Sequence, residues 1–216
     1  CKSHLLFVGF LVLLLLLLAP RRSCISLPLR FSFLRLLCIC RPGAHWPWII
    51  LVVASAPFYE WFTHKFVLHA DLSPVPGRWR DYQIRLHHGH HLDPADRELQ
   101  FAPASGIVVI MVQLYLFYAL ITWSVSVALV PMAGSIAYYL FYEWIHLAHH
   151  TPAYQPKTRM GAALRDAHMR HHFHNENYNW GITNALGDLM LGTWKHMTDV
   201  PKSPTARHLH NFNPNS

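Results

Sequence analysis

The sequence predicts an all-α integral membrane protein, a transmembrane bundle of about four apolar helices. The first reason is composition: 52% of the 216 residues are hydrophobic, and the mean hydropathy is +0.17. The second is that the apolar residues lie in long blocks, at 5–19, 46–62 and 103–147. The third is that nothing alternates with period two, which disfavours a barrel and leaves helices to satisfy the backbone in lipid.

Residues 1–45 form a segment with a composition of its own. They hold all four cysteines and six basic residues, but no acidic residue. The apolar run at 5–19, followed by Arg21 and Arg22, is typical of a signal-like segment or a short span. Because the chain opens on Cys1, we interpret this segment as a span or a doubtful start, without a function of its own.

The formal net charge of +7 does not indicate a nucleic-acid partner. Residues 1–45 account for +6 of it, and the remaining chain carries 12 basic and 11 acidic residues. No basic groove interleaved with stacking aromatic residues is present, so we expect no nucleic acid to bind. No cysteine follows Cys40, which excludes a disulfide framework and thiolate metal ligands from the main domain.

A membrane domain is predicted over residues 46–200, and its first span is 46–63. Aromatic residues at both ends of this span suit an interfacial belt. The apolar tract 104–147 is long enough for two spans of about 20 residues each, so we expect a helical hairpin. Its turn should lie between residues 124 and 134. The polar residues 201–216, rich in Pro and Asn, are expected to form a flexible tail.

The histidine-rich segments are predicted to lie on one side of the membrane. The first span ends at His64, and the hairpin leaves that side near Pro103 and returns by His146. Basic residues at 65–97 and 157–170 share this side. The positive-inside rule makes it cytoplasmic, which means the endoplasmic reticulum membrane in a eukaryote and the inner membrane in a bacterium.

Histidine is the unusual residue of this sequence, with 18 copies against 11 acidic residues. The pattern His-x-x-His-His occurs three times, starting at His87, His146 and His168. On a helix, positions i, i+3 and i+4 lie on one face, about 5–6 Å apart at Cβ, so each copy should direct several nitrogens to one place. His64 and His69 are five residues apart, which puts them on different sides of an ideal α-helix. Both are therefore expected either to serve one centre because the helix ends there, or to reach two different ions.

The repeated pattern predicts metal binding. A buried core histidine or a terminal tag would not explain spaced copies at the ends of apolar helices. About ten imidazoles converge, and one ion takes about four to six ligands, so two ions are expected. An all-nitrogen site beside an apolar pocket favours iron and oxygen activation. Zinc is the alternative in purified protein, because divalent affinities favour it over Fe(II).

Other polar residues are assigned lesser parts. Five histidines are not expected to be ligands, namely His4, His45, His196, His208 and His210. Three more should lie behind the ligands or face solvent, namely His88, His149 and His174. Carboxylates near the clusters are candidates to orient imidazole N–H groups. These are Glu60, Asp93, Asp96, Glu143, Asp166 and Glu176.

Four segments together resemble the fatty acid hydroxylase/sterol desaturase superfamily of integral-membrane di-iron enzymes. They are HKFVLH (64–69), HHGHHLDPADREL (87–99), EWIHLAHH (143–150) and AHMRHHFHNENYNWGITNALGDLMLGT (167–193). The resemblance covers about residues 46–195. The His-x4-His box, the HH-x-x-P-x-D segment and the G-I-T…G-D…G-T ending are most similar to the fatty acid 2-hydroxylase branch.

The resemblance implies a cytoplasmic, histidine-rich helical cap that holds a dimetal site on the transmembrane bundle. The ligands that it implies are His64, His69, His87, His90, His91, His146, His150, His168, His171 and His172. His150 is chosen over His149 because the family's third box has the spacing His-x3-His. Two iron ions and O2 as co-substrate are implied, and no catalytic residue beyond the ligands.

The implied reaction is the O2-dependent insertion of a hydroxyl group into the acyl chain of a membrane lipid or fatty acid, at C2 by likeness to that branch. Electrons would come from a separate protein, cytochrome b5-like or ferredoxin-like, since no haem-binding motif is present. A sterol or carotenoid hydroxylase or desaturase of the same superfamily is the first alternative. A non-enzymatic, His-rich membrane metal-binding protein is the second. A transporter is disfavoured because residues 104–142 offer few polar groups.

Two positions depart from the family pattern. The chain has Gly187-Asp188 where the family usually has Trp-Asp, and Leu191-Gly192-Thr193 where it has Phe-Gly-Thr. These changes affect the C-terminal lid of the site more than its ligands. They therefore bear on the identity of the substrate rather than on metal binding.

Overall fold

The computed structural model describes residues 46–71 and 77–211, and every regular element in these residues is helical. The predicted all-α class is confirmed for this part of the chain. The apolar segment 1–45, with its expected span at 5–19, lies outside the described residues, as does the end of the chain from 212 to 216.

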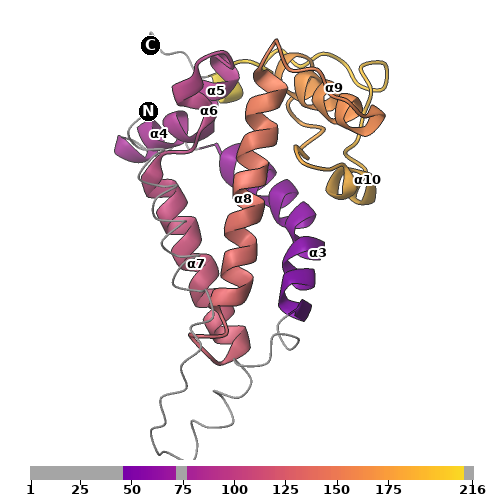
Figure 1. The fold of residues 1–216 in the computed structure, drawn as a ribbon. Helices are drawn as coiled ribbons and strands as arrows, with labels where there is room; N and C mark the ends of the chain where they lie inside the picture. Colours follow the sequence, from indigo (N-terminus) through magenta and orange to yellow (C-terminus); the bar gives the residue numbers. More distant parts are fainter. Residues whose placement is uncertain (1–45, 72–76, 212–216) are drawn as a thin grey trace, which may run out of the picture. The chain divides into compact units, whose positions relative to one another are not determined.

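Three long helices stand side by side: α3 (Trp46–Thr63), α7 (Ala104–Thr122) and α8 (Leu129–His150) (Figure 1). Helix α8 packs against both α3 and α7. Helices α7 and α8 form the expected hairpin, and its turn occupies residues 123–128. Trp123 takes a left-handed conformation there, with φ at 51°. Gly134 therefore lies within α8, where its missing side chain admits Ile49 and Val52 of α3.

One helical stretch among the described residues, Arg97–Thr122, is long and apolar enough to cross a membrane, with a mean hydropathy of 2.1. Only 11% of that apolar window is buried, and side chains such as Leu116 and Leu120 are exposed. By length and composition alone, one such helix is weak evidence of a membrane protein. Helices α3 and α8 contain Glu60 and Glu143, and these carboxylates lower their mean hydropathy.

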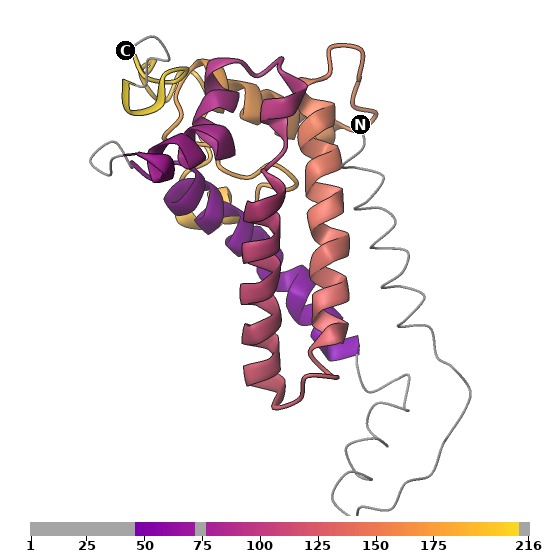
Figure 2. The same cartoon turned by 90° about the vertical axis from the view of Figure 1, so that its left-hand side faces the viewer.

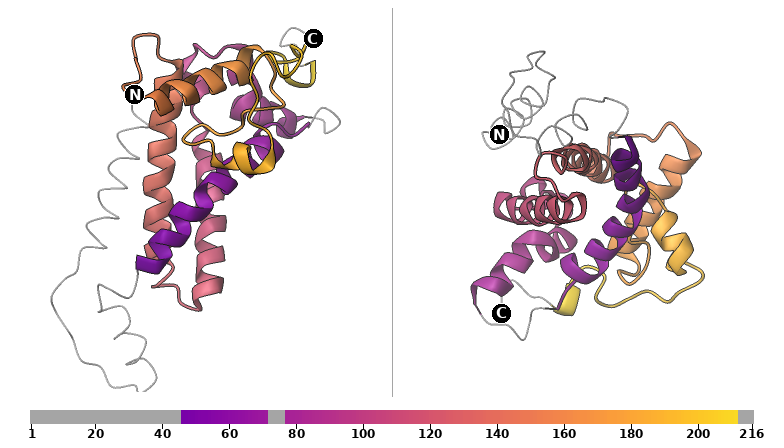
Figure 3. Two further views of the ribbon diagram at one scale, coloured as in Figure 1. Left: turned by 90° about the vertical axis from the view of Figure 1, so that its right-hand side faces the viewer. Right: turned by 90° about the horizontal axis from the view of Figure 1, so that it is seen from below.

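Short helices form a cap at the end of the long helices where α8 finishes (Figures 1 and 2). Its elements are the π-helix η2 (His64–Leu68), α4 (Arg78–Gln83), the π-helix η3 (Ile84–His88), α5 (Gly89–Leu92), α6 (Arg97–Gln100), α9 (Arg159–Phe173) and the 3-10 helix η4 (Leu209–Asn211). Helix α10 (Leu186–Leu191) lies against α3. Figure 3 shows that α3 is inclined to α7 and α8, which run nearly parallel to each other. The cap therefore covers one end of the three long helices.

The chain after α10 runs back over the cap instead of leaving it. Residues 201–210, which we call the C-terminal strap, lie where the sequence suggests a flexible tail. Ser203 N donates to His174 O at 2.7 Å, and Asn175 Nδ2 donates to Pro201 O at 2.9 Å. Leu209 is buried. These contacts involve mainly backbone groups, which a polar composition does not reveal.

Candidate dimetal centre

Ten histidines gather in two groups where the long helices meet the cap. The first cluster is His64, His69, His87, His91 and His171, and the second cluster is His90, His146, His150, His168 and His172. Within each cluster one nitrogen from every residue lies within 4.8 Å of the others. These are the ten histidines that the resemblance implies as ligands. In the part of the chain that the structure describes, no other histidine joins either cluster.

The π-helix η2 brings His64 and His69 into the same cluster. His69 N donates to His64 O at 3.1 Å, which is the i→i+5 hydrogen bond of a π-turn. Because this turn holds one extra residue, two side chains five positions apart face the same way. Their ring centroids lie 5.0 Å apart. Of the two possibilities that the sequence leaves open, one shared centre is therefore observed, because the α-helix ends at Thr63 and the π-turn follows.

The three His-x-x-His-His patterns do not each serve one centre. In η3 and α5, His87 and His91 belong to the first cluster, but His90 belongs to the second. In α9, His171 belongs to the first cluster, although both residues that share its pattern lie in the second. Helix α8 contributes His146 to the second cluster only. The prediction of one centre for each pattern is therefore corrected for two patterns.

A second π-turn precedes His90. Gly89 N–H bonds to Ile84 O across the turn, and a Cβ on Gly89 would lie 3.0 Å from that oxygen. A glycine therefore relieves the crowding at the end of η3.

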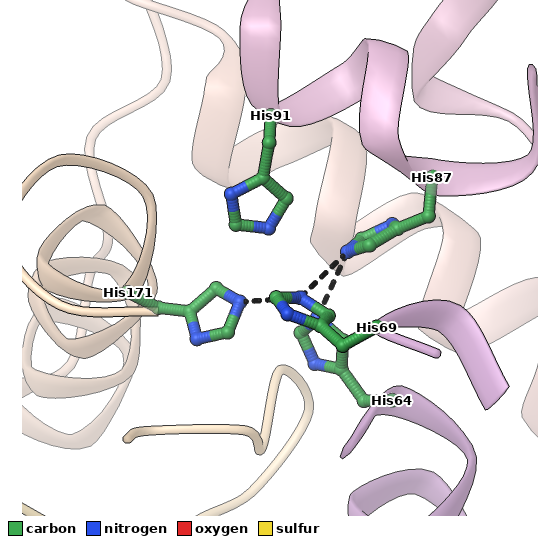
Figure 4. A group of neighbouring side chains, drawn as sticks. All are labelled: His64, His69, His87, His91 and His171. Atoms are coloured by element: carbon green, nitrogen blue, oxygen red, sulfur yellow. Dashed lines mark hydrogen bonds between the residues drawn. The ribbon is translucent and has the colours of Figure 1, made fainter. Parts of the chain in front are cut away.

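Figure 4 shows the first cluster, to which η2, η3, α5 and α9 contribute. The Nε2 atoms of His64 and His87 lie 3.1 Å apart, and those of His69 and His171 also lie 3.1 Å apart. In the second cluster, His150 Nε2 lies 2.8 Å from His168 Nε2. Neutral imidazoles that face one another this closely have lone pairs in need of a proton or a cation. The donor set therefore fits a metal ion in each cluster.

The cluster histidines are neutral at ordinary pH. Burial is the main cause: it holds the pKa of His87, His168 and His172 well below the usual 6.5, and neighbouring imidazoles lower it further. For His91, burial lowers the pKa to about 3. A neutral imidazole keeps a free lone pair, which is the form that binds metals. The sites therefore suit cations without needing to lose protons first.

Backbone carbonyls orient three histidines of the first cluster. His64 Nδ1 donates to Trp180 O at 2.6 Å, and His171 Nδ1 donates to Tyr178 O at 2.8 Å. His91 Nδ1 donates to Ala206 O in the C-terminal strap at 2.9 Å. Since a carbonyl can only accept, each Nδ1 carries the hydrogen and Nε2 keeps its lone pair for the cluster.

The sequence suggested carboxylates for this orienting part, but in the described hydrogen bonds none of the six candidates contacts a cluster histidine. Two carboxylates act one step further out, on the loop at 178–184. Glu60 accepts from Thr183 N at 2.9 Å and from Ile182 N. Asp188 accepts from Trp180 N at 3.0 Å and from Gly181 N at 2.7 Å. They hold the loop whose carbonyls orient His64 and His171.

The remaining candidate carboxylates have local partners. Asp93 and Asp96 accept from backbone N–H groups two residues further on, and Asp166 pairs with Arg170. Glu176 accepts from Ser203 Oγ in the C-terminal strap at 2.9 Å. They therefore stabilise the frame of the site.

The histidines outside the two clusters fall into several environments. His88 and His149 are buried, with exposed fractions of 5% and 3%, so neither faces solvent. His196 and His208 are exposed. His210 Nε2 donates to the backbone oxygen of His69 at 2.9 Å, a contact that the sequence did not indicate. His174 Nε2 bonds to Val200 O, while His4 and His45 lie outside the described residues.

The glycine at position 187 has a packing reason. A Cβ there would lie 2.8 Å from Trp61 Cβ and 3.1 Å from Pro57 O. Only glycine lets α10 approach α3 this closely without a shift. The contact is fixed further along by Trp61 Nε1, which donates to Thr193 Oγ1 at 2.9 Å. The departure from the family's usual Trp thus accompanies a close contact between α10 and α3.

A cavity of about 170 Å³ lies between α3, α7 and α8, and it reaches both clusters. His64 and His87 of the first cluster and His146 of the second form part of its wall. Away from the histidines the wall is largely apolar, with residues such as Val52, Ala56, Ile110, Met111 and Leu114. A molecule in this cavity would have apolar walls around it and both clusters beside it.

Polar groups line the cavity near the histidines. They include Glu60, Tyr138, Tyr139, Tyr142 and Glu143. Glu60 accepts from Thr183 and from Tyr138 OH at 3.0 Å. Glu143 accepts from Tyr139 OH through one oxygen, and its other oxygen, Oε2, is buried without a hydrogen-bond partner in the described chain. A substrate group that donates a hydrogen bond would satisfy that oxygen.

The sequence is similar to those of known proteins. The fatty acid hydroxylase family matches residues 49–193. The dihydroceramide fatty acyl 2-hydroxylase FAH1 of Arabidopsis thaliana is 29% identical over 149 residues, which cover 68% of this chain and 60% of that protein. The ceramide very long chain fatty acid hydroxylase SCS7 of Saccharomyces cerevisiae is 27% identical over 139 residues, covering 62% and 34%. The chain thus spans 60% or less of each of these two relatives.

A solved structure has the same fold. It is described as full length scs7p with only the hydroxylase domain visible, and it matches with a TM-score of 0.65. The match covers 80% of this chain and 67% of the other, at 20% sequence identity. At that identity the likeness shows the fold alone.

Proposed function

Because the chain belongs to the fatty acid hydroxylase family, we propose that it is an oxidoreductase that uses O2 to insert a hydroxyl group into a lipid acyl chain. The observation that carries this proposal is the cavity shared by the two clusters, with His64, His87 and His146 in its wall. A carbon placed there lies beside both clusters at once. Its apolar walls suit a hydrocarbon chain and exclude water from the reacting carbon.

The two clusters are proposed to hold two iron ions, with zinc as the alternative in isolated protein. The proposed ligands are His64, His69, His87, His91 and His171 for one ion, and His90, His146, His150, His168 and His172 for the other. When bound, the ions would supply the reduction of O2 and the oxidising power to remove hydrogen from an unactivated C–H bond. All-imidazole coordination and neutral, buried rings support this choice.

The reaction needs an external source of electrons. Conversion of C–H to C–OH by one O2 consumes two electrons and two protons and releases one water. We propose a separate redox protein, cytochrome b5-like or ferredoxin-like, as the donor.

The substrate is proposed to be an amide-linked acyl chain that is hydroxylated at C2. The printed names of the Arabidopsis relatives, dihydroceramide fatty acyl 2-hydroxylases, support this choice. The polar end of the cavity supports it too, because C2 hydroxylation puts the carbonyl and its substituent next to the metals. The partnerless Glu143 Oε2 can accept an amide N–H, a donor that the carboxylate of a free fatty acid lacks.

The setting is proposed to be a membrane, with α3, α7 and α8 in the bilayer and the cap on the cytoplasmic side. Exposed apolar side chains on α3, such as Ile50 and Val53, and on α7, such as Leu116 and Leu120, support this arrangement. It corresponds to the endoplasmic reticulum of a eukaryote or the inner membrane of a bacterium. An acyl chain could then enter the cavity from the bilayer in which it already resides.

The test is a lipid analysis of a host that expresses the chain. Total lipids are hydrolysed and analysed by mass spectrometry, with the His171→Ala variant as the matched control. New 2-hydroxy acids that occur only with the unmodified chain are the expected result. New hydroxylated or desaturated sterols or carotenoids would move the assignment within the superfamily. The last outcome is metal-loaded protein that alters none of these lipids although its electron donor is supplied. This result would contradict the proposal and favour a non-enzymatic metal-binding protein.

A further inference from the structure

The two clusters differ in what holds their histidines from behind. We infer that the first cluster retains its metal ion more tightly than the second, and that the C-terminal strap contributes to this difference. The inference rests on the proposed dimetal function. The two sites have five histidines each, so their composition alone does not indicate a difference in metal affinity.

In the first cluster three ligand rings are locked by hydrogen bonds. The carbonyls of Trp180, Tyr178 and Ala206 accept from His64, His171 and His91. Such a bond fixes the tautomer and the ring orientation and makes the ligand more basic; its loss typically costs about 10–100-fold in metal affinity. The carbonyls belong to two separate segments, the loop after α9 and the C-terminal strap. The rings are therefore held in place before any ion binds.

In the second cluster the corresponding atoms have no such partners. The Nδ1 atoms of His90, His168 and His172 are buried without a hydrogen-bond partner among the described residues. Behind the cluster their rings are held by packing, for example by the stacking of His172 on His91 with centroids 4.1 Å apart, while His90 and His168 also contact His150 through their Nε2 atoms inside the cluster. Without an acceptor behind it, each ring can carry its hydrogen on either nitrogen. An ion there has to select both the tautomer and the orientation, which weakens binding.

The C-terminal strap reaches the first cluster at two points. Ala206 O accepts from the His91 ring, and His210 Nε2 donates to the backbone oxygen of His69 at 2.9 Å. Among the described hydrogen bonds, none joins the strap to a histidine of the second cluster. The strap is thus placed to act directly on the first cluster and to reach the second only through the stacking of His172 on His91.

Anchors away from the ligands hold the strap in position. Glu176 accepts from Ser203 Oγ at 2.9 Å and from Thr205 Oγ1. Arg207 Nη2 donates to Leu92 O at 2.8 Å. Glu176 is buried, and in the described hydrogen bonds it contacts no cluster histidine. A change at Glu176 therefore loosens the strap without removing a ligand.

The experiment measures metal release from the full chain. Protein loaded with two equivalents of Zn²⁺ is diluted into excess chelator, and release is followed with a zinc indicator dye. Two phases are expected, with rates that differ by about tenfold or more, since orienting partners are worth about that much. His171→Ala should remove the slow phase, and His168→Ala should remove the fast phase.

The strap is tested in the same assay with Glu176→Ala. The slow phase should accelerate by about tenfold, the size of one lost orienting partner, and the fast phase should accelerate less, because the strap reaches the second cluster only through the stacking of His172 on His91. Asp199→Asn, an exposed change just before the strap, is the matched control. If Glu176→Ala does not fold, His210→Ala provides the second variant, with the same expected direction.

Several outcomes would overturn the inference. Release of both equivalents at one rate would do so, and so would loss of the slow phase in His168→Ala. If Glu176→Ala accelerated both phases equally, the strap would not be the cause of the difference between the two sites. Protein that binds no Zn²⁺ and no Fe²⁺ at all would instead contradict the proposed dimetal function, so the two failures are distinguishable.

Discussion

The Nδ1 atom of His64 lies 2.6 Å from the carbonyl oxygen of Trp180, although 116 positions separate the two residues in the chain. His64 begins η2, directly after α3, and Trp180 belongs to the loop after α9. The loop reaches this position because Asp188 accepts from its N–H groups on the other side. A ligand candidate at the start of the domain is thus oriented by backbone near its end.

Removal of the Asp188 carboxylate should loosen this loop. In Asp188→Asn an amide N–H faces backbone N–H groups, so buried donors are left without acceptors, at a cost of about 1–3 kcal/mol each. We expect lower thermal stability and a reduced metal content. Unfolding curves and metal analysis of purified protein would measure both. Asp93→Asn, a change at an exposed carboxylate, is the control. If Asp188→Asn were as stable as the unmodified chain, Asp188 would not hold the loop as described.

Substitution of cluster histidines should separate metal binding from folding in the membrane. His168→Ala, His171→Ala and His172→Ala are each expected to abolish product formation and lower the metal content. The protein should stay in the membrane fraction, because the long helices are unchanged. The exposed His208 serves as the control, and His208→Ala should retain both properties. Full turnover in any of the three variants would show that the ligand assignment is wrong.

The close approach of α10 to α3 predicts an unusual sensitivity at position 187. Gly187→Ala introduces a Cβ that would lie 2.8 Å from Trp61 Cβ, and such overpacking costs about 1–3 kcal/mol. Gly187→Trp should be worse, even though the family usually has Trp at this position. Thermal unfolding would measure the effect, with the exposed Leu189→Ala as the comparison on the same helix. Equal stability of the Gly187 and Leu189 variants would contradict the packing argument.

The partnerless oxygen of Glu143 predicts a part in substrate selection. Glu143→Ala removes the acceptor, so the KM for an N-acyl amide substrate should rise by about tenfold, roughly the value of one hydrogen bond to a charged group. The metal content should not change, since Glu143 contacts no cluster histidine in the described bonds. Steady-state kinetics in detergent would test this, with the exposed Glu98→Gln as control. An unchanged KM, or a higher activity on amide substrates, would show that Glu143 does not bind the substrate amide.

A histidine-rich site was predictable because a spaced histidine pattern repeats at the ends of apolar segments, but the spacing alone did not select the ten histidines. The resemblance implied them as a set, and the structure gathers the same ten. Their division between two clusters was not predictable, since it depends on the π-turns at His64–Leu68 and Ile84–His88. A hydrophobic pattern does not reveal one extra residue in a turn.

The groups behind the histidines were also missed, for a different reason. The orienting acceptors are the carbonyls of Trp180, Tyr178 and Ala206, and every residue has a carbonyl regardless of its side chain. The C-terminal strap was missed because its contacts join backbone groups and scattered polar side chains to distant residues, and a polar composition does not reveal such partners. The Gly-Asp pair marks Asp188 as a notable residue in the sequence. Its hydrogen-bond partners, the backbone N–H groups of residues 180 and 181, could not be recognised from the sequence.

Neighbouring residues in the chain belong to opposite clusters. His90 and His91 lie on either side of one peptide bond, as do His171 and His172, and in each pair one ring goes to each cluster. Consecutive Cα atoms are fixed about 3.8 Å apart by covalent geometry. The covalent chain thus links the two clusters directly at two places, which lie on different helices. A shift of α5 or α9 therefore moves candidate ligands of both clusters together, so the cavity can change shape without separating the two clusters.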